Sequence, residues 1–179
     1  VIYENGKLRQ LSVPKGKALY NAAEKARTAL TSRFRIETPD PYINTLGGAL
    51  VAAADGIWDG EVWLHGANGW RMPLSGWRAA YTGDCLGWHD RARRHFDNYA
   101  ASQVTEIAPV YLHPTQDSVM NMARSAKKWG TQMYSNGYIC RNPNRNNQMH
   151  HYDMNLCYID ELLWHLCWTG DLDFAKKMW

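Results

Sequence analysis

The feature that most constrains this fold is an alternation of two kinds of predicted helix along the chain. Residues 41–54 carry no charge, and residues 154–168 are apolar almost all round, whereas the helical segments before and after them are amphipathic. A helix that is hydrophobic on every side is normally buried. We therefore expect the two apolar helices to be enclosed and to be the most buried parts of an all-α fold, in which outer and inner helices alternate.

Periodicity and capping signals place the individual helices. Asp40 before Pro41 marks a helix start, and the pair Gly47-Gly48 inside the second helix indicates that another segment packs closely there, since each glycine lowers helix propensity. The expected helices cover residues 17–34, 41–58, 88–104, 118–129 and 153–169, and a further helix begins after Asp171.

Two dipeptides predict minor β-hairpins. Asn5-Gly6 and Asn136-Gly137 both tolerate the positive φ angles of a type I′ turn. We assign residues 1–16 to a strand-like linker from a preceding β-rich domain, and residues 17–179 to a helical domain. The chain begins without methionine and ends within a helical pattern, so we expect it to be part of a longer protein.

Composition excludes several classes of protein. The net charge is only +3 and the basic residues are scattered, so we expect no nucleic-acid partner. No stretch resembles a signal peptide or a membrane span. The four cysteines lack C-x-x-C spacing, which argues against a zinc site. We expect buried free thiols, although a bridge from Cys85 to Cys140 stays conceivable.

Residues 58–91 contain five tryptophans interleaved with carboxylates, arginines and glycines. Aromatic faces can stack on the C–H faces of sugar rings, while charged side chains bind sugar hydroxyls. The alternative is that the tryptophans and arginines stack on each other and stiffen a long loop. The pattern predicts a sugar-binding wall without excluding this second interpretation.

The carboxylates of these loops are the candidate catalysts. Glu61 lies between Trp58 and Trp63 in sequence, and apolar walls would raise the pKa of its carboxyl group. Asp84 and Asp153 are further candidates, although each has the alternative of capping a helix.

Several histidines also invite a functional interpretation. Glu161 and His165 form an i, i+4 pair inside an apolar helix, and we interpret them, together with Asp160, as paired groups that structure the core. The adjacent pair His150-His151 favours sugar recognition over metal binding, because neighbouring side chains of an extended segment point in opposite directions. We expect no metal and no cofactor.

Five motifs carry a resemblance to a known group of enzymes. They are Thr38-Pro39-Asp40, HGANGWR at 65–71, SGWR at 75–78, LGWHDR at 86–91, and HHYDMN at 150–155 followed by WTGD at 168–171. From about residue 17 onward the chain resembles the six-hairpin α/α-toroid glycosidases, including rhamnosidase-like and disaccharide-phosphorylase-like enzymes. It looks most like an uncharacterised toroid family from bacterial polysaccharide-degrading systems.

The resemblance implies part of an α/α toroid, because the chain holds about two helical hairpins and the start of a third, whereas a closed toroid has six. It implies hydrolysis of an oligosaccharide or polysaccharide by two carboxylates, about 6.5–9.5 Å apart in an inverting enzyme. The candidates in this sequence are Glu61, Asp84 and Asp153. Residues expected to bind substrate are His65, Trp70, Arg71, Trp77, Arg78, Trp88, Arg141, His150, His151 and Tyr152.

The expected partners are the carbohydrate, the remainder of the toroid and a preceding β-domain in the parent protein, and the expected location is periplasmic or extracellular. Two alternatives stay open. One is a non-catalytic toroid that binds glycans or acts as a scaffold. The other is a polysaccharide lyase, which would use tyrosine and histidine as base and acid, with candidates Tyr81, Tyr138, His150 and Tyr152.

Overall fold

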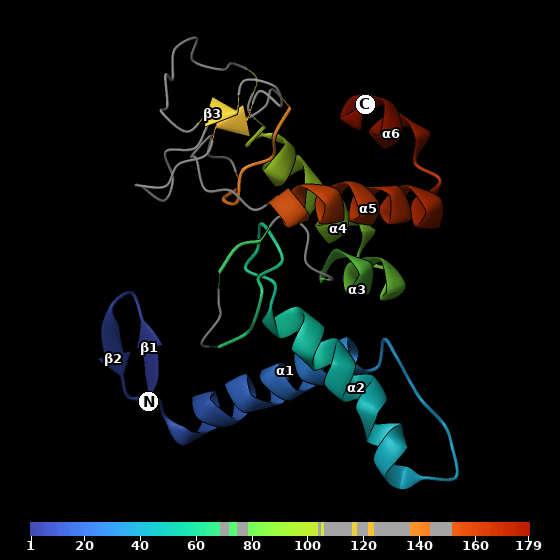
Figure 1. Cartoon of the computed structure of the whole chain (residues 1–179). Coiled ribbons are helices and arrows are strands. Elements are labelled where there is room, and N and C mark those ends of the chain that lie inside the picture. The colour runs from blue at the N-terminus through green and yellow to red at the C-terminus, as the bar shows by residue number, and fades with distance from the viewer. Residues whose placement is uncertain are drawn as a thin grey trace. The chain divides into compact units, whose positions relative to one another are not determined.

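The computed structural model describes residues 1–68, 72–74, 79–103, 105, 116–117, 122–123, 137–143 and 152–179 (Figure 1). Within these residues the protein is mostly helical, with six helices and two small antiparallel hairpins. The all-α expectation with minor hairpins is therefore confirmed at this level. The chain divides into two compact units, Val1–Ala53 and Ala54–Trp179, which are described separately.

The first unit opens with the predicted hairpin. Strand β1 (Ile2–Glu4) pairs antiparallel with β2 (Lys7–Arg9), so that Tyr3 lies opposite Leu8. The two turn residues both have positive φ angles, 51° at Asn5 and 76° at Gly6. This is the backbone that the Asn-Gly dipeptide favours, and it matches the right-handed twist of the strands.

Helix α1 (Val13–Thr31) follows the hairpin and starts four residues before the predicted position. Pro14 lies in its first turn, where the missing N–H costs no hydrogen bond. Helix α1 has no buried residue, although an amphipathic and half-exposed helix was expected. On its surface Arg27 forms a salt bridge with Glu24, one turn away.

Helix α2 (Pro41–Gly56) begins as predicted, because the Asp40 carboxylate accepts a hydrogen bond from the Tyr42 backbone N–H at 2.8 Å. The glycine pair inside it does mark a close approach. A Cβ atom on Gly47 would lie 2.6 Å from the carbonyl oxygen of Phe34, and one on Gly48 would lie 3.3 Å from the Cβ of Thr31. The chain leaving α1 thus packs against α2 where only glycine fits.

The expected enclosure of the two apolar helices is wrong. In α2, Leu50 is 54% exposed and only positions such as Val51 and Ala54 are buried. In α5 (Tyr152–Thr169), Leu163 is 57% exposed. An apolar composition allows a helix to be buried on every side, but burial also requires packing partners on every side. Each of these two helices buries only some of its side chains.

The second unit contains α3 (Ala79–Cys85), α4 (His89–Ala100), α5 and α6 (Leu172–Met178), and its helices pack against one another, α3 and α5 each contacting α4 (Figure 1). Helix α3 was not predicted, since its residues were assigned to a loop. The core between these helices includes Phe96, Tyr99, Tyr158 and Phe174, and the Tyr158 hydroxyl donates to the Phe96 carbonyl oxygen at 2.9 Å.

Helix α4 is amphipathic, as predicted, and buries one of its faces. Ala92, Phe96 and Tyr99 are buried, whereas Gln103 lies beyond the helix end and is exposed. His95 is a buried member that the pattern did not single out, and its Nδ1 accepts a hydrogen bond from the Trp63 backbone N–H at 3.0 Å.

The C-terminus of α5 and the N-terminus of α6 agree with the capping signals in the sequence. Gly170 follows α5 with a φ angle of 63°, and the Asp171 carboxylate accepts a hydrogen bond from the Phe174 backbone N–H at 2.9 Å. Asp160, which was expected to lie inside an enclosed helix, is exposed.

Other expectations between residues 104 and 151 fall largely outside the described residues. The predicted helix at 118–129 is wrong at the two positions that are described, since Met122–Ala123 forms strand β4 and pairs with β3 (Gln116–Asp117). Of the second predicted hairpin, Gly137 has a φ angle of 91°, and Ile139 pairs with Gln103.

The four cysteines are free thiols, as expected, but the expected burial is wrong for Cys85 and Cys167, which are exposed. Among the described residues, none of the helices combines the length and the apolar content needed to cross a membrane.

Candidate functional site

Three of the five clustered tryptophans form a packed stack. The ring centroids of Trp58 and Trp63 are 4.9 Å apart, and those of Trp63 and Trp88 are 5.9 Å apart. The Arg91 guanidinium lies 4.2 Å from the Trp88 ring centroid and donates to the Asp55 carboxylate at 2.8 Å. Trp63 and Trp88 are buried, so the geometry favours the packing interpretation for this stack over a sugar-binding wall.

The turn that follows the first tryptophan is fastened to α4. Asp59 shapes the turn, because its Oδ1 accepts from the backbone N–H groups of Glu61 and Val62 at 2.8 and 2.7 Å. The Asn98 side-chain amide then donates to Glu61 twice, at 3.0 Å to the backbone carbonyl and at 2.9 Å to Oε2. The Glu61 carboxylate is therefore held in one orientation against α4.

Beside this turn lies a cavity of about 600 Å³ that is wide open to solvent and has a charged lining. One face of α4 supplies most of the lining, because residues separated by three, four and seven positions lie on the same side of a helix. The lining residues are Glu61, Asp90, Arg93, Arg94, Asp97 and Asn98. The apolar surroundings expected for Glu61 are absent, since Glu61 is exposed and none of these residues is aromatic.

The lining carboxylates differ in their partners. Lys177 donates to Asp97 at 2.7 Å, and Arg93 forms an ion pair with Asp171 at 3.2 Å. Within the described part of the chain, neither Glu61 nor Asp90 forms an ion pair. These two acids are the lining carboxylates left without a basic partner, and Asp90 was not among the residues singled out from the sequence.

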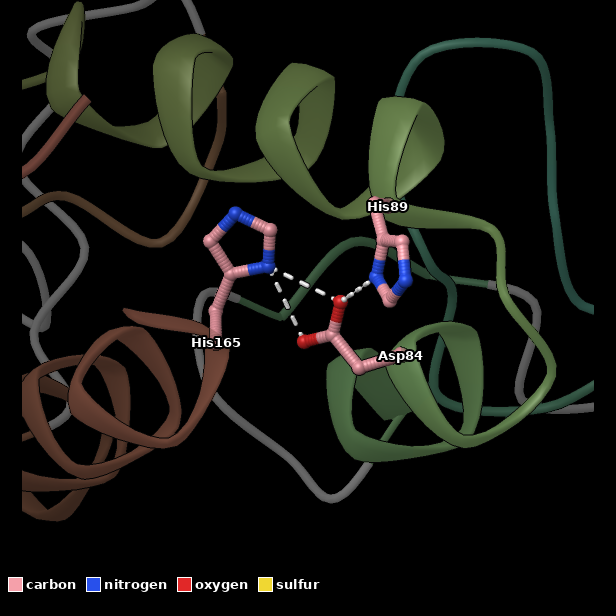
Figure 2. A group of neighbouring side chains, drawn as sticks. All are labelled: Asp84, His89 and His165. Carbon is pink, nitrogen blue, oxygen red and sulfur yellow. Dashed lines mark hydrogen bonds and ion pairs between the residues drawn. The ribbon is translucent and has the colours of Figure 1, made fainter. Parts of the chain in front are cut away.

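A second constellation surrounds Asp84, near the end of α3. The two carboxylate oxygens of Asp84 lie 2.9 and 3.0 Å from Nδ1 of His165 on α5, and Oδ1 also lies 2.9 Å from Nδ1 of His89, the first residue of α4 (Figure 2). The side chains of Asp84 and His165 are 2% and 0% exposed, whereas that of His89 is 45% exposed. Three helices thus converge on one carboxylate.

The environment of His165 explains why this constellation was missed. Its ring packs against Phe96 and Phe174, with centroids 5.4 and 5.5 Å apart, and its Nδ1 binds Asp84, although the sequence suggested a pair with Glu161. The signal in the sequence that could have indicated this constellation is the short spacing of Asp84 and His89, five residues apart. Gly87 lies between them and has a φ angle of 72°, which allows the chain to turn there.

The remaining predicted site residues are scattered. Asp153 is exposed in the first turn of α5, where the positive end of the helix dipole stabilises its negative charge. His65 is half-buried, and Arg141, also half-buried, reaches the sulfur of Met72. Tyr152 is the first residue of α5. Six predicted residues lie outside the described part of the chain, namely Trp70, Arg71, Trp77, Arg78, His150 and His151.

Comparisons of the chain with protein-family models, with curated proteins and with solved structures yielded no match.

Proposed function

We propose that this chain is part of a carbohydrate-active α/α toroid that hydrolyses a glycosidic bond of an oligosaccharide or polysaccharide, with Glu61 and Asp90 as its acid and base. The observation that carries the proposal is the charged cavity beside Glu61, where two carboxylates lack a basic partner among the described residues. The expected periplasmic or extracellular location and the remainder of the toroid belong to the same proposal.

The lining suits a ligand rich in hydroxyl groups. Carboxylates accept hydrogen bonds, guanidinium groups donate them, and the Asn98 amide does both, so that each hydroxyl can find a charge-assisted or amide partner. The volume of about 600 Å³ falls within the usual range for small-molecule sites. An apolar ligand would leave these charges without hydrogen bonds, which is costly.

The two carboxylates differ in a way that suits acid and base. The Asn98 amide donates to Oε2 of Glu61, so the side chain is held with Oε1 available to the glycosidic oxygen. Asp90 lies in the first turn of α4, where the helix dipole stabilises negative charge, as a base that activates water requires. Asp84 takes no part in this scheme, because it is buried and its oxygens already lie 2.9 to 3.0 Å from the Nδ1 atoms of two histidines.

The test is release of reducing ends from a panel of neutral and acidic polysaccharides and oligosaccharides. Wild-type protein should hydrolyse at least one of them, and Glu61→Gln or Asp90→Asn should each lower the rate at least about 100-fold, the lower end of the usual effect of general acid–base catalysis. Both changes keep the shape of the side chain and its hydrogen-bonding capacity.

Asp153→Asn is the matched control, since it removes another predicted catalytic carboxylate that lies outside the cavity, and its rate should equal that of wild type. Hydrolysis that survives both cavity variants within about tenfold would refute the assignment. Saturable binding without any hydrolysis would identify the non-catalytic glycan-binding alternative, and an unsaturated product would identify a lyase.

A further inference from the structure

Asp84, His89 and His165 bring together the side-chain atoms of a metal site. Each offers one ligand atom, and these atoms all lie within 4.8 Å of one another. They come from three helices, with Asp84 near the end of α3, His89 at the start of α4 and His165 in α5, and Figure 2 shows both imidazoles turned toward the carboxylate.

We propose that these three residues bind a divalent transition-metal ion, and that Zn²⁺ is the ion that fits best. Two imidazole nitrogens and one carboxylate oxygen form a ligand set typical of zinc sites that keep an open position for water or substrate. Calcium and magnesium prefer sites made only of oxygen ligands. The site does not depend on the proposed hydrolysis, because its ligands do not line the cavity beside Glu61.

The spacing of the ligand atoms is close to that of a metal site. The Asp84 oxygens lie 2.9 to 3.0 Å from the two Nδ1 atoms. In a tetrahedral site with bonds of about 2.1 Å, neighbouring ligand atoms are about 3.4 Å apart. Both contacts therefore have to lengthen by about 0.4 Å when an ion binds. His89 can move because its side chain is 45% exposed, whereas the contact between Asp84 and His165 has to adjust within the packed helices.

Two of the three proposed ligands are buried and the third is accessible to solvent, as a site that takes up an ion requires. Asp84 and His165 are almost fully buried, so their rotamers are fixed by packing, and the rings of Phe96 and Phe174 hold the His165 imidazole in place. The half-exposed His89 is the side from which an ion can enter. Binding uses the lone pair on each Nδ1, so the proton of each neutral imidazole resides on Nε2.

The competing interpretation is a hydrogen-bonded network without metal, in which both imidazoles donate Nδ1–H to the carboxylate. Such a network satisfies buried Asp84 equally well, so hydrogen-bond geometry does not separate the two cases. Metal binding does separate them, because a network of this kind gives no saturable affinity for Zn²⁺.

The experiment is a titration of chelator-treated protein with Zn²⁺ by calorimetry, and with Co²⁺ by its visible absorption, which reports coordination geometry. Wild-type protein should bind one ion at micromolar concentrations or below. His89→Gln should weaken binding at least about 100-fold, because it removes a ligand rather than an outer partner, whose loss alone typically costs 10- to 100-fold. This half-exposed position should also tolerate the change without loss of folding.

Asp84→Asn provides a second variant, with nearly unchanged shape and no anionic ligand. The matched control is His65→Gln, which removes a half-buried histidine that is not one of the three proposed ligands and should leave the affinity unchanged. A urea midpoint that rises with Zn²⁺ in wild type but not in His89→Gln would agree with binding to the native state. Equal affinity in wild type and His89→Gln, no binding by wild type, or loss of binding in His65→Gln would overturn the proposal.

Discussion

Replacing Gly83 by alanine should destabilise the second unit, although alanine is the better helix former. Gly83 lies inside α3, and a Cβ atom there would be 2.9 Å from Cζ2 of the Trp63 ring. Ordinary carbon contacts are about 3.5–4.0 Å, so the methyl group must displace the ring or the helix. The ring has little freedom to move, because it is fully buried between Trp58 and Trp88.

Two opposing terms determine the magnitude. Alanine in place of glycine gains up to about 1 kcal/mol of helix propensity. Forcing an extra methyl group into a packed core costs about 1–3 kcal/mol. The net expectation for Gly83→Ala is a loss of about 1 kcal/mol in the free energy of unfolding. The matched control is Gly16→Ala in α1, where a Cβ atom meets nothing within 4 Å, and this variant should gain about 0.5–1 kcal/mol.

Urea denaturation can follow the two variants separately. All nine tryptophans of the chain follow residue 54, so their fluorescence reports the second unit and the effect of Gly83→Ala. Far-UV circular dichroism also reports α1 and the effect of Gly16→Ala. If Gly83→Ala stabilised the protein as much as Gly16→Ala does, the packing of α3 against the Trp63 ring would be refuted.

Two further predictions follow from burial. Leu163→Ala should cost less than about 1 kcal/mol because Leu163 is largely exposed, whereas Phe174→Ala should cost about 3–5 kcal/mol, and equal losses in urea denaturation would contradict this. Burial raises the pKa of the hydroxyls of Tyr99 and Tyr158 above the ordinary value. The unfolded chain therefore releases these protons near pH 10 while the folded chain keeps them, so stability should fall as the pH rises above about 10. Tyr158→Phe should reduce that fall, and a tyrosinate absorbance showing both groups ionised in folded protein would contradict it.

Local signals allowed several elements to be predicted from the sequence. The Asn5-Gly6 turn depends on the backbone preferences of two adjacent residues, and the Asp171 cap depends on a contact three residues away. Such interactions are complete within a few residues, so a sequence pattern contains them. Helix α3 was missed because it is only seven residues long and contains Gly83, and it depends on packing against α4 and α5.

The candidate sites could be predicted only in part, because their residues are far apart in sequence. Glu61 was identified, but its partner Asn98 lies 37 residues away, and the polar cavity that they share gives Glu61 surroundings opposite to those expected. His165 lies 81 residues from Asp84, and its nearer neighbour Glu161 suggested a different pair. For the tryptophans, the sequence was compatible with both packing and sugar binding. The ring contacts of Trp63 with its neighbours, which a sequence pattern does not contain, favour packing.

The most direct test of the proposed function is calorimetric titration of the protein with the neutral oligosaccharides that it is proposed to hydrolyse. The Glu61→Gln variant should bind an oligosaccharide with nearly wild-type affinity and without turnover, since the change preserves shape and hydrogen bonding. Asn98→Ala, which removes the amide that orients Glu61 in the cavity, should weaken binding at least about tenfold. Asp173→Asn, at an exposed position of α6, should have no effect. If no oligosaccharide binds, or if Asn98→Ala binds as tightly as wild type, the cavity beside Glu61 is not a carbohydrate site.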